Sequence, residues 1–295
     1  ATGISFPDVL IVQGLYQFKP PFPFSPGSEI SGVISSVGEG VTLHKEGDRV
    51  MGSIGSGGLC EKGVYSEHQL MPLPESMDFN TAAGFPLNYG TTYHAFKQRG
   101  ELKEGQSVLV LGAGGGLGIT AIHIAKAMGA KVIAAASSQE KIDLCKKEGA
   151  DEGIIYERDM DRDLQKKFSD QIKDVTGGGV DMIYDLVGGD YAEPALRAIA
   201  RHGKYLVIGF TAGIPKMPLN LTLLKECQII GVFWGQFAGL DQAENQQNFK
   251  ELFELHAKGE INPFVTETFT LEESAKAIKT LEDRKVLGKV VVSME

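Results

Sequence analysis

Short apolar runs alternate with segments of helical spacing through the middle of the chain. The runs have the length of buried strands and lie at 108–111, 131–136, 154–155, 182–186, 205–208 and 229–234. The helical segments lie at 88–99, 117–128, 138–147, 163–175 and 191–199. Strands separated by helices of this length require right-handed crossover connections. The pattern therefore predicts a parallel sheet with helices packed against it.

The two ends of the chain have a different pattern. Prolines crowd the segment 20–26, and short alternating runs follow at 30–37 and 49–51, which is typical of small antiparallel strands. The last part of the chain contains two helical patterns and a closing strand, at 245–258, 271–283 and 289–292. These ends are therefore expected to form a second, mostly β domain.

Length and charge narrow the class of protein. The chain has 295 residues, enough for two domains of about 150 residues each. We expect a mostly β domain built from 1–87 and 236–295, with a parallel α/β domain over 88–235 inserted in it. No apolar run is long enough to span a membrane, and the net charge of -9 would repel phosphate backbones and anionic lipid. We expect neither a membrane protein nor a nucleic-acid binder.

Cysteine usage points to a reducing compartment. Cys60, Cys145 and Cys227 are too few for a disulfide framework in a chain of this length and too far apart for a Cys-x-x-Cys pair. The composition thus predicts a cytoplasmic protein.

A glycine-rich turn lies between the first predicted strand of the α/β region and its helix. Gly112, Gly115 and Gly118 fit the spacing G-x-x-G-x-x-G. Glycines at these places permit a tight turn and close backbone approach, and the free amides at the helix N-terminus bind a pyrophosphate. A glycine turn that packs without ligand is the alternative, but the strand, turn, helix and second strand together favour dinucleotide binding.

The end of the second predicted strand indicates which dinucleotide. An NAD-binding protein carries an acidic residue there, whereas this chain has Ser137, with Lys141 in the following helix. A hydroxyl and an ammonium can bind the 2′-phosphate that a carboxylate would repel. NADPH is therefore the expected cofactor. Ser137 with Glu140 also fits a helix capping box, which is compatible with phosphate binding.

Several motifs together resemble one superfamily. They lie at 26–33, 37–41, 47–50, 88–96, 112–118, 185–189, 203–210 and 288–291. They resemble the signatures of the medium-chain dehydrogenase/reductase superfamily, and 231–235 is similar to its zinc-independent NADPH:quinone oxidoreductase branch. The resemblance implies an α/β fold in which a Rossmann-type doubly wound parallel sheet is inserted in a mostly β, GroES-like substrate domain.

The motifs argue against a metal. Ser28 stands where zinc alcohol dehydrogenases carry a histidine ligand, and the cysteine ligand of that branch has no counterpart near Asp8. Without a Lewis acid, hydride transfer favours acceptors that delocalise the incoming charge themselves. We therefore expect an NADPH-dependent enzyme that reduces a quinone or an α,β-unsaturated carbonyl, with no bound metal.

The resemblance assigns roles to individual residues. The cofactor-binding positions are Thr91, Gly112, Gly115, Gly116, Leu117, Gly118, Ser137, Lys141, Tyr156, Gly209, Phe210, Phe233 and Arg284. Ser5 and Tyr16 are candidates for the substrate site. Ser5 departs from the family, which often has an asparagine there, and a serine cannot offer both amide functions at once. Acceptor positioning is thus the least defined part of the prediction.

The sequence leaves two alternative functions and the oligomeric state open. An enoyl-thioester (enoyl-CoA) reductase would need a basic channel, and no cluster of Lys and Arg supplies one. A low-turnover NADPH-binding sensor or structural protein is a second alternative. An exposed edge strand at 229–234 would favour a homodimer. Because the chain starts at Ala1, we also expect that the N-terminal strand region of the family is missing.

Overall fold

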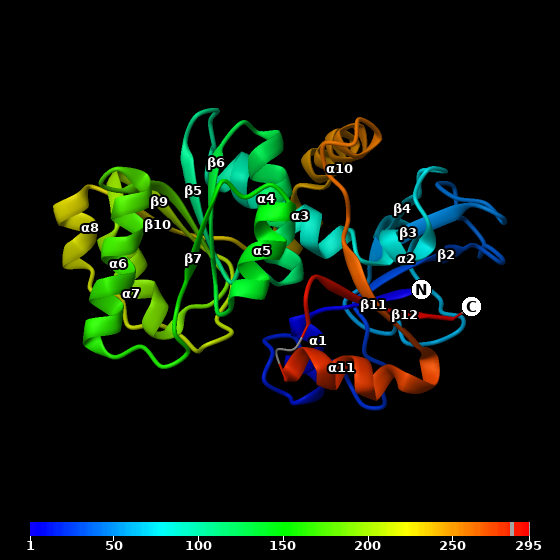
Figure 1. The fold of residues 1–295 in the computed structure, drawn as a ribbon. Helices are drawn as coiled ribbons and strands as arrows, with labels where there is room; N and C mark the ends of the chain where they lie inside the picture. The colour runs from blue at the N-terminus through cyan, green and yellow to red at the C-terminus, as the bar shows by residue number, and fades with distance from the viewer. Residues whose placement is uncertain (284–285, 295) are drawn as a thin grey trace. The chain divides into compact units, whose positions relative to one another are not determined.

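The computed structural model describes residues 1–283 and 286–294, and these divide into two units. Unit 1 consists of Ala1–Asn88 with Pro263–Glu295, and unit 2 of Tyr89–Asn262. The first unit is thus built from both ends of the chain, with the second inserted in it, as Figure 1 shows by colour.

Unit 1 is built on a mixed sheet. Its strands are β1 (Thr2–Ile4), β2 (Glu29–Val33), β3 (Arg49–Ser53), β4 (Leu70–Pro72), β11 (Val265–Thr270) and β12 (Lys289–Ser293). Their order is β11-β12-β1-β2-β3-β4, and among the described strands of this sheet only β11 and β12 pair in parallel. β12 thus pairs with β1, which brings the two ends of the chain together.

Short helices surround this sheet. They are α1 (Phe6–Val12), a 3₁₀ turn at Glu67–Gln69, α2 (Phe79–Ala83), a 3₁₀ turn at Leu271–Glu273 and α11 (Ser274–Glu282). α1 lies beside α11, and Gln13 donates a hydrogen bond to Glu282 at 2.8 Å. One apolar cluster under these helices contains Ile4, Phe269, Ala277, Val286, Val290 and Val292.

Unit 2 contains a parallel sheet. Its strands are β5 (Ser107–Leu111), β6 (Lys131–Ala136), β7 (Glu152–Ile155), β8 (Val180–Asp185), β9 (Ile199–Val207) and β10 (Gln228–Gly231). Their order is β10-β9-β8-β5-β6-β7, and every pair is parallel. In order of appearance this is 6-5-4-1-2-3, the dinucleotide-binding arrangement. The expected doubly wound parallel sheet is confirmed.

Helices cover both faces of this sheet in Figure 1. They are α3 (Pro86–His94), continued by a π-helical turn at Ala95–Arg99, then α4 (Gly116–Ala127), α5 (Gln139–Lys147), α6 (Arg162–Thr176), α7 (Gly189–Arg197), α8 (Asn220–Lys225), α9 (Trp234–Leu240) and α10 (Gln242–Ala257). α4 and α5 contact β5, β6 and β7, whereas α6 and α7 contact β7, β8 and β9. The strands between are buried on both faces and are therefore continuous apolar runs.

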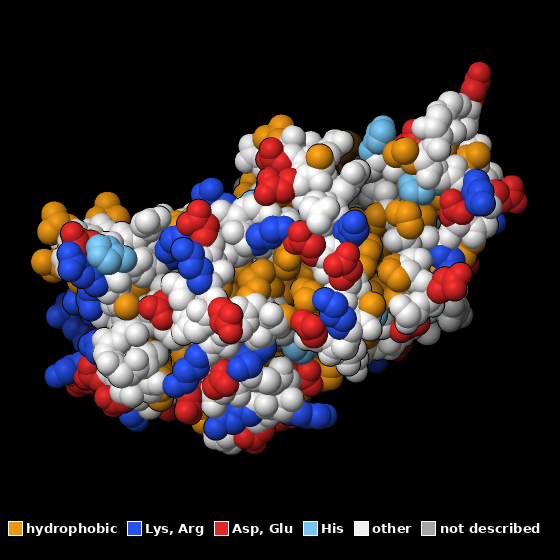
Figure 2. Space-filling view, turned by 90° about the horizontal axis from the view of Figure 1, so that it is seen from above, with side chains coloured by type: hydrophobic (Ala, Val, Ile, Leu, Met, Phe, Trp, Pro, Cys, Tyr) orange, Lys and Arg blue, Asp and Glu red, His pale blue; other side chains and the backbone are white. Residues whose placement is uncertain are grey.

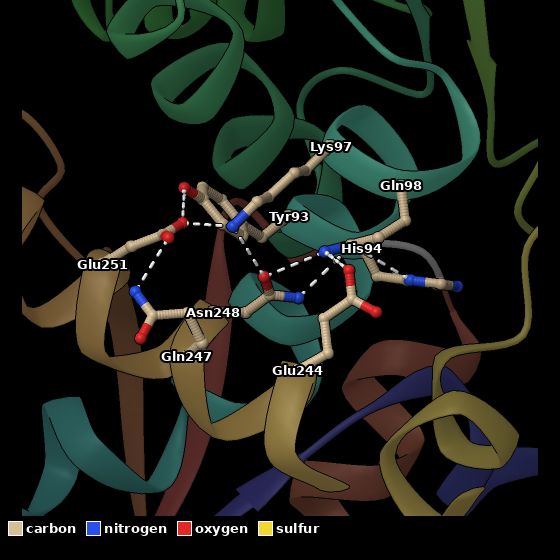
Figure 3. Close-up of polar contacts among 8 residues, drawn as sticks. All are labelled: Tyr93, His94, Lys97, Gln98, Glu244, Gln247, Asn248 and Glu251. Carbon is tan, nitrogen blue, oxygen red and sulfur yellow. Dashed lines mark hydrogen bonds and ion pairs between the residues drawn. The ribbon is translucent and has the colours of Figure 1, made fainter. Parts of the chain in front are cut away.

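The C-terminal boundary differs from the expected one, because α10 packs on α3 through polar contacts. Figure 3 shows this cluster, in which Glu251 accepts hydrogen bonds from Tyr93 at 2.6 Å and from Lys97 at 2.5 Å. Gln98 donates to Asn248 at 2.9 Å in the same cluster. Residues 236–262 thus belong to unit 2, whereas the sequence pattern placed them with the β domain.

The expected outer strand at 229–234 is also shorter than predicted. β10 ends at Gly231, and Trp234 begins α9. Trp234 packs against α3 instead, since a Cβ built on Gly90 would lie 2.6 Å from its ring. Its indole donates a hydrogen bond to Asn245 at 2.9 Å. The Trp234 side chain therefore packs from α9 against α3. The apolar run at 229–234 could not reveal this, because it has the pattern of a strand up to its last residue.

Candidate functional site

The glycine turn lies at the point where the strand order of unit 2 reverses. β5 and β8 are neighbours in the sheet, but their crossover helices cover opposite faces. In sheets of this type ligands bind at the carboxyl ends of the strands at such a point. The turn that follows β5 ends at Gly116, the first residue of α4. The first amides of α4 therefore face the place where the fold binds anions.

The glycines of this turn are required for different reasons. Gly112 has a positive φ of 77°, and its amide donates to the carbonyl of Ala135 at 3.1 Å. A Cβ on Gly118 would lie 2.4 Å from the carbonyl oxygen of Ala113, so only glycine lets α4 approach the turn. A Cβ on Gly115 would lie 3.7 Å from the carbonyl oxygen of Gly112, an ordinary van der Waals contact, so this position has room for a methyl group. Gly112 thus supplies the tight turn and Gly118 the close packing, while Gly115 is the N-cap of α4.

The end of β6 resolves the double role expected for Ser137. The N-cap of α5 is Ser138, whose hydroxyl accepts a hydrogen bond from the amide of Lys141 at 3.3 Å. The capping interpretation of Ser137 was therefore wrong by one residue, and Ser137 is not the cap. A Cβ on Gly114 would lie 2.9 Å from the Cβ of Lys141. The structure therefore brings the stem of Lys141 against the glycine turn.

The turns after β8 and β9 lie beside the glycine turn. Asp185, at the end of β8, accepts hydrogen bonds from the amides of Val187 at 2.7 Å and Gly188 at 2.9 Å, and from the hydroxyl of Tyr205 at 2.6 Å. Burial raises the pKa of this carboxyl, while the three donors act against that rise. Asp185 thus fixes the loop that contains Val187. The Val187 side chain lies close to the glycine turn, because a Cβ built on Gly112 would lie 3.0 Å from it.

Two of the expected nicotinamide positions follow β9. The amide of Gly209 donates to the carbonyl of Asp185 at 3.2 Å, and Phe210 lies within 3.2 Å of where a Cβ on Gly188 would stand. Phe210 is 42% exposed. Gly112, Gly209 and Phe210 are therefore brought together at the carboxyl edge of the sheet.

Other expected cofactor residues lie on helices. Thr91 is half-buried on α3, and Phe233 is the N-cap of α9 and 62% exposed. Gly90 precedes Thr91 and Trp234 follows Phe233 in the sequence, and Gly90 and Trp234 are in contact. Tyr156 instead packs its ring on Tyr191, with centroids 4.7 Å apart. Its contact with adenosine stays a prediction, and Arg284 lies outside the described residues.

The two expected substrate residues are in unit 1. Ser5 is the N-cap of α1, and its amide donates to the carboxylate of Asp8 at 2.8 Å. The other oxygen of Asp8 accepts from the amide of Gly27 at 3.1 Å. Burial raises the pKa of Asp8 to about 6. Tyr16 is half-buried, and burial, with a smaller effect of the Asp8 charge, raises its pKa.

A buried ion pair surrounds the Ser5 hydroxyl. Glu29 at the start of β2 is fully buried, and Lys289 at the start of β12 is 5% exposed. Lys289 forms an ion pair with Glu29 and donates to the Ser5 hydroxyl at 2.5 Å, while that hydroxyl donates to Glu29 at 3.1 Å. The sequence analysis missed this pair. The available signal was a charged residue at the start of each of two apolar strands, one near each end of the chain.

A groove of about 840 Å³ in unit 1 is separate from these residues. Ile30, Val33, Cys60 and Tyr65 are among the residues that line it. Over residues 1–283 and 286–294 there is no group of three or more His, Cys, Asp or Glu placed to hold a metal. Ser28, where zinc enzymes carry a ligand, has a buried hydroxyl without a hydrogen-bond partner in that part of the chain. The expectation of a metal-free site stays a prediction.

Comparison with known proteins identifies the family. The model of the alcohol dehydrogenase GroES-like domain matches residues 1–77, and that of the zinc-binding dehydrogenase matches residues 116–258. Quinone oxidoreductase-like protein 2 of Bos taurus is 36% identical over 295 residues, which cover 99% of this chain and 83% of the relative. The chain belongs to the zinc-independent quinone oxidoreductase family of the medium-chain dehydrogenase/reductase superfamily. It is an oxidoreductase with a GroES-like and a Rossmann-type domain, as the sequence predicted.

Solved structures support the same fold. The Escherichia coli quinone oxidoreductase complexed with NADPH has a TM-score of 0.90 at 29% identity, covering 99% of this chain and 89% of that one. A probable oxidoreductase from Mycobacterium abscessus has a TM-score of 0.87 at 36% identity, covering 99% of this chain and 87% of that one. No helix among the described residues is long and apolar enough to cross a bilayer.

Proposed function

We propose that this protein is an NADPH-dependent oxidoreductase that transfers hydride to a quinone or an α,β-unsaturated carbonyl compound. The observation that carries the proposal is the glycine turn at the strand-order reversal of unit 2, in a chain of this family. Relatives named quinone oxidoreductase and a neighbour solved with NADPH support the cofactor and the class of acceptor. The fold alone would not distinguish among these activities.

The residues of unit 2 fit the proposed cofactor. The first amides of α4, from Gly116 onward, would hold the pyrophosphate, and Ser137 with Lys141 would bind the 2′-phosphate. Gly209 and Phe210 would line the nicotinamide end. When bound, NADPH supplies the hydride. The protein then has to orient the acceptor and stabilise the charge that develops on its oxygen.

The cofactor preference can be tested at Ser137. We expect NADPH to bind at least about tenfold more tightly than NADH, since a phosphate held by a hydroxyl and an ammonium gains charge-assisted hydrogen bonds. Ser137→Asp should weaken NADPH binding by roughly tenfold or more and leave NADH binding within about twofold. Isothermal titration with both dinucleotides measures this. Ser138→Asp is the matched control, because aspartate also caps a helix and should leave the ratio unchanged. Equal affinities in the unmodified protein would contradict the assignment.

The reaction is tested with a panel of acceptors in the presence of a chelator. NADPH oxidation should be seen with quinones or enones and should persist without free metal. An enoyl thioester in the same panel tests the alternative reductase. Loss of activity on chelation would contradict the metal-free site, and absence of turnover with every acceptor would contradict the proposed reaction.

We also propose that the protein forms a homodimer through the β10 edge of unit 2. β10 is an edge strand, and before it the N-cap residue Leu219 is 69% exposed and Leu223 and Leu224 of α8 are 76% and 68% exposed. Figure 2 shows hydrophobic side chains at the left margin, where Figure 1 places α8. An open edge beside an apolar patch favours pairing with a second copy across a two-fold axis. The three free cysteines support a reducing, cytoplasmic compartment.

A further inference from the structure

The carboxylate of Asp185 at the end of β8 is buried, and its two oxygens have different partners. Oδ1 accepts hydrogen bonds from the amides of Val187 at 2.7 Å and Gly188 at 2.9 Å, whereas Oδ2 accepts one from the hydroxyl of Tyr205 at 2.6 Å. Asp185 and Tyr205 are 2% and 1% exposed. Both oxygens are thus bound inside unit 2, so Asp185 acts on its surroundings through the loop that follows it.

The loop, and not the strand, requires this carboxylate. Burying a carboxylate opposes folding unless donors replace the water that it loses. The preceding residues 182–184 of β8 are buried without a charged group, so the strand itself does not need one. In the loop, however, two consecutive amides converge on Oδ1, as in an Asx turn, and Gly188 and Gly189 have positive φ values of 67° and 51°. Asp185 therefore specifies the course of the loop.

This loop is joined to the loop after β9, and together they form a platform. The platform consists of residues 186–189 and 209–213. The carbonyl of Val187 accepts a hydrogen bond from the amide of Ala212 at 2.8 Å, and the amide of Gly189 donates to the carbonyl of Gly213 at 2.7 Å. A Cβ on Gly188 would lie 2.6 Å from that same carbonyl oxygen, so the loops pack with no side chain between them here. A change in the course of the first loop therefore displaces the second.

The platform lies on one side of the glycine turn. Its Val187 side chain is 3.0 Å from where a Cβ on Gly112 would be, in the turn after β5. In the sheet, β8 and β9 lie on one side of β5, and β6, which precedes Ser137 and Lys141, lies on the other. A dinucleotide bound at this point crosses from one side to the other. With the 2′-phosphate proposed at Ser137 and Lys141, the nicotinamide half falls on the side of the platform.

We propose that Asp185, held by Tyr205, is a positioning residue for the nicotinamide half of NADPH. The inference rests on the proposed function. Asp185 does not touch the cofactor; it fixes the platform, on which Gly209 and the 42% exposed Phe210 would line the nicotinamide. The adenosine half binds on the other side of the glycine turn and does not depend on this carboxylate. Asp185 thus sets how tightly the nicotinamide half is held, and not the preference for the 2′-phosphate.

The test compares NADPH with 2′-phospho-ADP-ribose, an analogue that lacks the nicotinamide. Asp185→Leu nearly keeps the size of the side chain but leaves the amides of Val187 and Gly188 without their acceptor. In isothermal titration it should weaken NADPH binding about tenfold or more and change binding of the analogue by less than about twofold. Asp185→Asn keeps an oxygen for both amides and should retain most of the NADPH affinity. Tyr205→Phe, which removes only the partner of Oδ2, should give a smaller loss than Asp185→Leu.

Controls separate this from a general loss of stability. Ile183→Val, two positions earlier on β8 and fully buried, should lower the melting temperature and leave both affinities unchanged. If Asp185→Leu does not fold, Gly188→Ala displaces the same platform, because its Cβ would meet the Gly213 carbonyl, and should show the same selective loss. Equal losses for NADPH and the analogue, or an Asp185→Asn variant as weak as Asp185→Leu, would overturn the positioning role while the proposed function stands. Absence of NADPH binding by the unmodified protein would overturn both.

Discussion

At the scale of single residues, unit 1 buries more charge than its composition suggests. Asp8, Glu29 and Lys289 are each at most 5% exposed. Asp8 is satisfied by two amides, yet burial still raises its pKa to about 6. Its charged form is therefore disfavoured in the folded protein relative to the unfolded chain.

This shift has a defined sign in stability. Because the pKa of Asp8 in the folded protein lies above its ordinary value of 3.8, the stabilisation from protonating Asp8 is fully present below about pH 4 and is lost as pH rises through about 6. At about 1.4 kcal/mol per pKa unit, the change amounts to roughly 3 kcal/mol. The asparagine in Asp8→Asn does not titrate, so only the unmodified protein loses this stabilisation as pH rises. The difference in free energy of unfolding between the unmodified protein and the variant should therefore shrink by about that amount between pH 4 and 7.

Urea unfolding of both proteins across this pH range makes the measurement. The pKa values of Asp151 and Glu251 are lowered, partly because lysine side chains donate hydrogen bonds to them. These two groups therefore change the stability with pH in the opposite direction to Asp8. Both are present in both proteins, so their effect cancels in the difference. A difference that does not change with pH would contradict the buried carboxyl.

At the scale of elements, the sequence correctly predicted the strands that form continuous apolar runs. β5, β6 and β8 were found because strands buried on both faces leave continuous apolar stretches. α1, α8 and β11 were missed, since elements this short or this exposed have no clear period. The glycine turn was found from its spacing and its place between a predicted strand and a predicted helix, whereas the Lys289–Glu29 pair joins residues too far apart for any local pattern.

Two glycines of the turn should respond differently to the same substitution. Gly118→Ala forces a Cβ to within 2.4 Å of the Ala113 carbonyl, so it should destabilise the protein by roughly 1–3 kcal/mol and weaken NADPH binding. Gly115→Ala meets nothing nearer than 3.7 Å and should leave the melting temperature of the free protein nearly unchanged.

The second variant should still bind NADPH more weakly, because its methyl group is added at the N-cap of α4, whose first amides would hold the pyrophosphate in the proposed complex. Thermal unfolding with and without NADPH separates the two effects. Equal loss of stability in both variants would contradict the separate roles given to these glycines.

At the scale of the whole molecule, the boundary between the units depends on side chains that the sequence pattern could not pair. Residues 236–262 follow unit 2 because Glu251 and Asn248 bind α3 and its π-helical turn. Polar contacts of this kind leave no hydrophobic period, so the pattern placed the boundary too early.

The proposed dimer belongs to this scale. Leu223→Lys/Leu224→Lys places two charges on the exposed apolar face of α8 and should convert a species with the mass of two chains into monomer. Leu43→Lys/Val64→Lys, at exposed apolar positions of unit 1, is the control and should leave the mass unchanged. Light scattering coupled to size-exclusion chromatography reads out both. A monomer in the unmodified protein would contradict the dimer.

The pairing of β1 with β12 has a consequence for biosynthesis. Thr2 is registered with Val292, so the sheet of unit 1 joins residues separated by nearly the whole chain, whereas every strand of unit 2 lies in one continuous segment. A ribosome delivers all of unit 2 before β11 and β12 emerge. Unit 2 can therefore fold while unit 1 still lacks its centre, and the buried partner of Glu29 arrives only after the whole of unit 2.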